Sequence, residues 1–90
     1  MELEINFVEN GTIELVGYRD GDIIDRLDFS FKSNLDTQLL TAVDKFLKKN
    51  RIDLLSFDPI SVTGDVDKNS TAYTIVMTWI AAVGMIKKQA

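Results

Sequence analysis

The loop at residues 65–70 holds the side chains best suited to binding an ion. Asp65, Asp67 and Asn69 alternate along it and resemble the first half of a calcium-binding loop. Such a loop needs glycine at its sixth position and glutamate at its twelfth, but this chain has Ser70 and Val76 there. The pattern therefore favours a solvated loop whose polar residues cap the helix that follows.

The same loop leads into a helix N-terminus, which is a natural site for an anion. A phosphate site wants glycines so that the backbone can approach closely, and this loop has only Gly64. Its two aspartates would also repel an anion. An enzyme that bound a nucleotide or a metal here would depend on Asn6, Asp65, Asp67 and the helix start at Ser70, and we keep this as the alternative interpretation.

Carboxylates elsewhere in the chain do not converge on a cation in the predicted strands. Asp25 and Asp28 would point to opposite faces of one strand, so the acidic residues around them serve solubility and edge protection. Glu4 and Glu14 would share an outer sheet face with Arg26, which favours ion pairing across strands over metal binding.

Composition excludes much of catalytic chemistry. The 90 residues contain no histidine and no cysteine, so the commonest general base, the thiolate nucleophile and the commonest transition-metal ligands are all absent. A net charge of −4 disfavours direct binding to nucleic acid. The acidic, alternating start at residues 1–5 does not resemble a signal peptide. We therefore expect a cytoplasmic, non-catalytic protein without cofactor or metal.

The first third of the chain predicts a three-stranded antiparallel meander. Residues 2–8, 12–18 and 23–32 alternate between apolar and polar side chains, as half-buried strands do. Asn10-Gly11 is a strong hairpin signal, and residues 19–22 form a second turn. Val16 falls on the outward, solvated face in this pattern.

The rest of the chain predicts a helix, a short strand and a second helix. Residues 35–49 have one apolar and one charged face, with Asn50 available as a left-handed cap. Pro59 suits the start of a strand at residues 60–63, which a right-handed crossover makes parallel to the first strand. The order β-β-β-α-β-α indicates one α/β (α+β) domain over residues 1–90. It is a two-layer sandwich in which a mixed four-stranded sheet carries both helices on one face.

The last helix, at residues 71–88, is more apolar than such a fold requires. A helix on a sheet needs an apolar stripe only about 100° wide. Here apolar and small side chains cover more than half of the circumference. A transmembrane span needs about 20 apolar residues, whereas residues 72–86 supply fifteen. The surplus surface of this helix therefore predicts contact with another protein, through Tyr73, Met77, Ile80 and Gly84, joined by Leu40 of the preceding helix with Leu47 behind them. Trp79 is assigned to the core, with a role as an interface anchor as the alternative.

The pattern as a whole resembles the N-terminal lobe of the TsaB (YeaZ) family. The best-matching segments are Leu39-Leu40 with Val43, residues 57–62 and residues 72–84. The family has an actin-like ATPase, RNase H-like fold and supports the TsaD enzyme in making threonylcarbamoyladenosine on tRNA. Its members associate through the two helices of this lobe. The resemblance implies an actin-like half-domain that pairs as a homodimer or with a TsaD-like protein.

Two departures from the family pattern bear on nucleotide binding. The family's first strand carries Ile-Asp-Thr, where this chain has Ile5-Asn6-Phe7. The family's loop Gly-Pro-Gly-Ser-Phe-Thr-Gly corresponds to residues 63–71, which contain one glycine and no proline. The second lobe, which closes the nucleotide cleft, is not part of these residues. The resemblance therefore implies the fold and the pairing, not ATP binding.

Overall fold

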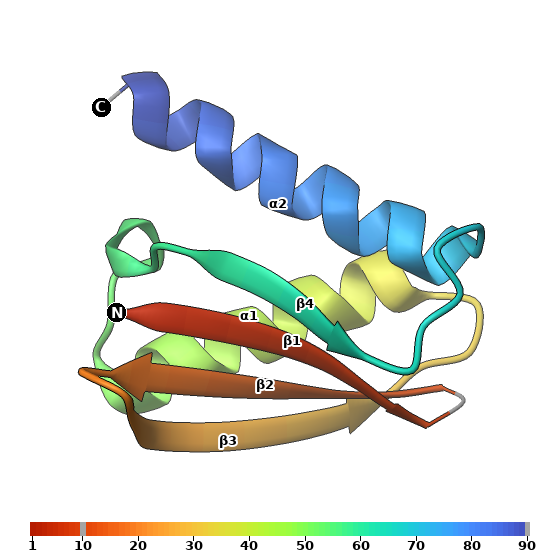
Figure 1. Ribbon diagram of the computed structural model, residues 1–90, viewed down its shortest axis with the longest axis horizontal. Helices are drawn as coiled ribbons and strands as arrows, with labels where there is room; N and C mark the ends of the chain where they lie inside the picture. The colour runs from red at the N-terminus through yellow and green to blue at the C-terminus, as the bar shows by residue number, and fades with distance from the viewer. Residues whose placement is uncertain (10, 90) are drawn as a thin grey trace.

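A computed structural model describes residues 1–9 and 11–89 (Figure 1). Asn10 of the predicted hairpin lies outside the described residues. The elements follow the predicted order. They are β1 (Glu2–Glu9), β2 (Thr12–Arg19), β3 (Asp22–Ser30), α1 (Leu35–Asn50), the 3-10 turn η1 (Leu54–Ser56), β4 (Ile60–Gly64) and α2 (Thr71–Gln89).

The four strands form one mixed sheet in the order β3-β2-β1-β4. β2 pairs antiparallel with both β1 and β3, and β4 pairs parallel with β1, with Ile5 opposite Val62. The parallel pair confirms the predicted crossover, because the chain must pass through α1 to bring β4 back in the direction of β1. A bulge between Gly17 and Tyr18 shifts the β2–β3 register near the second turn.

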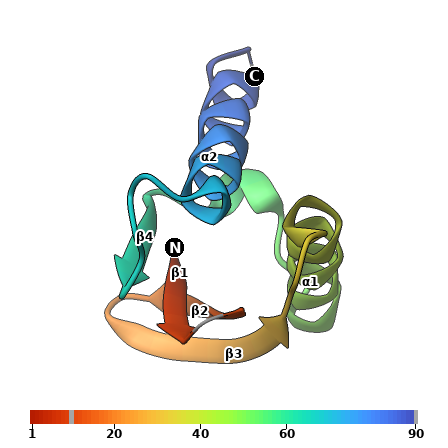
Figure 2. The ribbon, with the colours of Figure 1, turned by 90° about the vertical axis from the view of Figure 1, so that its right-hand side faces the viewer.

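Both helices lie on the same, concave face of the sheet (Figure 2). The inward residues of β1 and β2 alternate as predicted and are almost completely buried, with Leu15 at 0% exposure. They form one core with α1 and with Val76 of α2. The structure thus confirms an α+β fold with a mixed four-stranded sheet and two helices.

α1 is the better packed helix. Its buried residues recur at helical spacing, as expected for an amphipathic helix on a sheet: Leu35, Leu39, Ala42, Val43 and Phe46. The Phe46 ring lies over Gly17 of β2, where a Cβ atom would come within 2.8 Å of the ring. The left-handed cap is Arg51, at φ 54°, and not Asn50 as predicted. Asn50 stays helical because its side chain donates both to Asp25 Oδ2 and to the Phe46 carbonyl, each at 2.9 Å.

Phe57 closes the core at the end of the connector between α1 and β4. Its side chain is fully buried, and its ring centroid lies 6.2 Å from that of Phe46. Leu54 is half-buried, whereas Leu55 remains exposed. The connector is therefore attached to the core mainly through Phe57.

Val16 contradicts the prediction that the outer sheet face is solvated throughout. It points outward but is only 3% exposed. Its strand partners are Glu4 on β1 and Arg26 on β3. Because long polar side chains cover apolar neighbours with their aliphatic stems, these residues and Tyr18 shield Val16 from solvent.

Candidate interaction surface

α2 contacts the rest of the molecule along a narrow line. Of its 19 residues only Val76 and Val83 are buried. Met77, Met85 and Ile86 are large apolar residues that remain exposed, at 38%, 63% and 51%. The two helices begin close together and then diverge, so the C-terminal half of α2 stands away from α1 (Figures 1 and 2).

An apolar groove separates the two helices on the side away from the sheet. We call it the inter-helix groove, and it encloses about 320 Å³. Leu40 of α1 forms one rim and is 56% exposed, while Ile75 and Trp79 of α2 form the opposite wall. The groove is lined by Asp36, Leu39, Leu40, Thr74, Ile75, Thr78, Trp79 and Ala82.

A second hollow lies on the other flank of α2, against the start of β4. We call it the edge groove, of about 260 Å³. Ile80 and Gly84 form its helix side, and Pro59 and Ile60 form its strand side. At its end the Lys87 ammonium donates a hydrogen bond to the Phe57 carbonyl, which attaches the last turn of α2 to the connector.

The six predicted contact residues do not form one surface. Leu40 and Leu47 lie seven residues apart on the α1 flank nearest α2, and Leu47 packs partly against the core. Ile80 and Gly84 line the edge groove on the opposite flank of α2. Tyr73 and Met77 share that flank by helical spacing. Of the predicted residues, Leu40 therefore lines one groove, and Ile80 and Gly84 line the other.

Sequence reasoning missed the residues of α2 that line the inter-helix groove. Ile75 and Ala82 were not selected, and Trp79 was assigned to the core. Trp79 does pack against the core, but it is half-buried and also forms a wall of the groove. Its size was the available signal, since tryptophan often has one face in a core and another at an interface.

The outer face of the sheet carries a polar network centred on Glu4. Tyr18 donates to Glu4 Oε1 at 2.6 Å, and Thr63 donates to Glu4 Oε2 at 2.5 Å. Asn6 Oδ1 lies 3.2 Å from the Thr63 hydroxyl. The hydrogen bonds from Thr63 and Tyr18 lower the pKa of Glu4. The hydrogen bond that Tyr18 donates to Glu4 raises the pKa of Tyr18. These groups satisfy one another and link β2, β1 and β4.

The loop at residues 65–70 uses its polar groups to shape its own turn. Asp67 Oδ1 accepts from the Asn69 backbone at 2.9 Å, and the Ser70 hydroxyl donates to the Asp67 carbonyl at 2.6 Å. Ser70 also accepts from the Tyr73 N–H, and so caps α2 as predicted. The Asp65 N–H donates to the Phe7 carbonyl, next to Asn6. Within residues 1–9 and 11–89 no three acidic side chains gather as a metal site would require.

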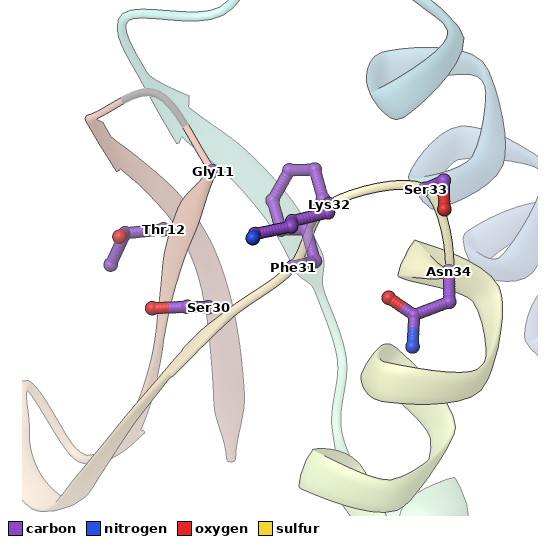
Figure 3. Close-up of a pocket in the computed structure, with 7 residues that line it drawn as sticks. All are labelled: Gly11, Thr12, Ser30, Phe31, Lys32, Ser33 and Asn34. Atoms are coloured by element: carbon purple, nitrogen blue, oxygen red, sulfur yellow. The ribbon is translucent and has the colours of Figure 1, made fainter.

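A hollow of about 690 Å³ lies between the start of β2 and the loop before α1 (Figure 3). The side chains of Thr12 and Ser30 point away from Ser33 and Asn34, which lie across the hollow, and the Lys32 ammonium projects between them (Figure 3). Because these polar groups diverge, they do not form a set of ligands for one molecule.

No helix in the described part of the chain has the length and hydrophobicity needed to cross a bilayer. Comparison of the chain with known protein families and with curated proteins found no match.

Proposed function

We propose that the protein is a non-catalytic interaction module that pairs with a second copy of itself through the inter-helix groove. The observation that carries the proposal is the exposure of α2, an apolar helix with only two buried residues. A contiguous surface of exposed apolar side chains marks an interaction site. The inter-helix groove is a space that side chains of another helix can fill.

The C-terminal half of α2 has the right character to fill that space in a second copy. Met85 and Ile86 are exposed there, beyond the reach of α1. In a two-fold, antiparallel arrangement of the two α2 helices, these side chains would enter the partner's groove beside Leu40 and Trp79. A two-fold interface uses the same patch on both copies, so one groove and one protruding end per chain suffice.

Charge and area support the same arrangement. Asp36 lies in the groove near its N-terminal end, and Lys88 is in the last turn of α2. Antiparallel pairing brings each carboxylate toward the second copy's ammonium group, which is favourable across an interface. A standard interface buries roughly 800 Å² per partner, a modest share of the 5821 Å² surface of this chain.

The resemblance to the TsaB N-terminal lobe supports pairing through these two helices. It also extends the proposal to a TsaD-like protein as a second possible occupant of the same groove. On this proposal the protein acts in the cytoplasm, and its link to threonylcarbamoyladenosine modification of tRNA runs through that partner.

Sedimentation equilibrium of the unchanged protein and two variants tests the proposal. Leu40→Asp places a charge on the rim of the groove, and we expect it to weaken self-association by roughly a hundredfold, because a desolvated unpaired charge costs several kcal/mol. Leu55→Asp is the matched control, since Leu55 is also exposed but lies on η1. It should pair as the unchanged protein does.

The outcomes separate the two occupants. Equal association of the Leu40→Asp and Leu55→Asp variants would contradict pairing through the groove. If the unchanged chain stays monomeric but binds a TsaD-like protein, and Leu40→Asp abolishes that binding, the groove is the interface and its occupant is not a second copy. Circular dichroism of each variant confirms that the fold is retained.

A further inference from the structure

We propose that β4 is a docking edge for an extended segment of another polypeptide, which would add to the sheet as a fifth strand. The inference goes beyond pairing through the inter-helix groove and depends on different residues. It follows from three features of the same region: the unpaired backbone of β4, the absence of charge along it, and the edge groove beside it.

The backbone of β4 has one side free. β4 is the last strand in the sheet order, so only β1 pairs with it. The Leu3 N–H donates to the Pro59 carbonyl at one end of the pair, and the Asp65 N–H donates to the Phe7 carbonyl at the other. The backbone N–H and C=O groups of successive residues in a strand point to alternate sides. The backbone groups of Ser61 and Thr63 therefore point toward β1. The N–H and C=O groups of Ile60 and Val62 therefore face away from the sheet.

The two edge strands of the sheet differ in how they are protected. β3 carries Asp22, Asp25, Arg26 and Asp28, the kind of charged residues that prevent an edge from pairing with another strand. β4, with the sequence Ile-Ser-Val-Thr-Gly, carries no charge at all. It therefore lacks the charged residues that protect β3.

The edge groove gives the added strand a place for side chains. Ile80, Val83 and Gly84 of α2 stand beside Ile60, and Tyr73 and Met77 continue the same flank of the helix. A strand next to β4 would point every second side chain toward this flank. Its side chains on the other face would lie beside Ser61 and Thr63.

These features specify the occupant. It is an extended segment with β-branched or leucine side chains at alternate positions and uncharged polar residues between them, as in other cases of strand addition. A second copy fits less well, because its own β4 would place Gly64, at φ +91°, opposite Ile60. That conformation lies outside the strand region. The backbone hydrogen bonds between two copies of β4 could therefore form completely only at the central pair of residues.

The probe is the acetylated and amidated peptide Thr-Val-Thr-Ile-Thr-Val-Lys, titrated into the full chain and followed by amide NMR. We expect the largest shifts, and new protection from hydrogen exchange, at the amides of Ile60 and Val62, with shifts also at Gly84. The control peptide is methylated at alternate backbone nitrogens so that it cannot pair with an edge, and it should not bind.

Two variants of Val62 isolate the backbone. Val62→Pro removes an N–H that β1 does not use, so the fold should persist. The peptide should bind roughly tenfold more weakly, because one hydrogen bond is lost and the adjacent ones are weakened. Val62→Ala removes the side chain but keeps the N–H, and should bind more tightly than Val62→Pro. If Val62→Pro does not fold, the methylated peptide on the unchanged chain decides the question.

Four results would overturn the proposal. They are no binding of the peptide at millimolar concentration, equal binding of the methylated peptide, shifts confined to Trp79 and Ala82 in the inter-helix groove, and protection of Ile60 and Val62 that appears without peptide as the protein is concentrated. The last result would identify a second copy as the occupant.

Discussion

The two helices lie on the same sheet but relate to it in different ways. α1 buries five of its 16 residues and turns charged residues such as Asp44 and Lys48 to solvent. α2 buries two of 19 and turns apolar residues such as Met85 and Ile86 to solvent. The comparison teaches that apolar content alone does not measure a helix's contribution to the core. The less apolar helix contributes more buried residues.

The difference separates stability from association. The interior side chains of α1 lie against β2 and the connector, so changes there should lower the free energy of unfolding. Met77, Met85 and Ile86 of α2 are exposed, so changes at these residues should alter binding and leave the fold intact.

The largest effect is expected from the aromatic contact beneath α1. Phe46→Ala removes a buried ring that packs on Gly17 and Phe57. It should lower the free energy of unfolding by about 3–5 kcal/mol, the usual cost of deleting a buried phenylalanine ring. Met85→Ala on α2 should change it by less than ~0.5 kcal/mol. Urea denaturation measures both, and comparable losses would refute the division between the helices.

Two glycines should respond to alanine with opposite signs. Gly17→Ala forces a methyl group into the Phe46 ring, and we expect a loss of about 1–3 kcal/mol from overpacking. Gly84→Ala meets no atom within 4 Å of the new carbon and lies inside a helix. It should therefore raise the free energy of unfolding by up to about 1 kcal/mol. Thermal unfolding would show the contrast, and a destabilised Gly84→Ala variant would mean that α2 packs more closely than described.

The smallest effect concerns the polar attachment of α1 to β3. The Asn50 amide, the Arg26 N–H and Lys49 lower the pKa of Asp25. A lowered pKa means that the ionised carboxyl stabilises the fold at pH values above about 3.9, the ordinary pKa of an aspartate. This contribution is lost as the pH falls through the lower value of the folded state. Asn50→Ala should move the pKa of Asp25 back toward its ordinary value.

An NMR titration of the Asp25 carboxyl, with and without the Asn50→Ala change, checks this expectation. Lys87 provides the comparison on α2, because its hydrogen bond to the Phe57 carbonyl involves no carboxylate. Acid should therefore loosen the end of α1 before the end of α2. An unchanged Asp25 titration in the variant would contradict the assignment of Asn50 as the main cause.

The fold was predictable because its strands and α1 each have one apolar face and one polar face. The alternation around Ile5 and Ile13 identifies an inward face, and the crossover rule then places β4 beside β1. The burial of Val16 was not predictable from alternation, since it depends on which residues stand opposite on neighbouring strands. The helix cap lies at Arg51 and not at the predicted Asn50, because the Asn50 amide donates hydrogen bonds to Asp25 and to the Phe46 carbonyl.

The candidate site was predictable only in part, for a related reason. An amphipathic helix can be oriented from its sequence, because its charged side must face solvent. α2 has no charged side along most of its length, so the sequence cannot indicate which flank faces α1 and which faces β4. The predicted Ile80 and Gly84 consequently lie in one groove and Leu40 in the other.

The central claim is that the exposed surface of α2 is covered by a second copy of the chain. The most direct test is the amide and indole NMR spectrum of the unchanged protein recorded over a wide range of concentrations. We expect Trp79, Ala82 and Ile86 to shift on concentration while Phe46 and Phe57 stay constant. A spectrum in which these α2 signals do not depend on concentration would contradict the claim.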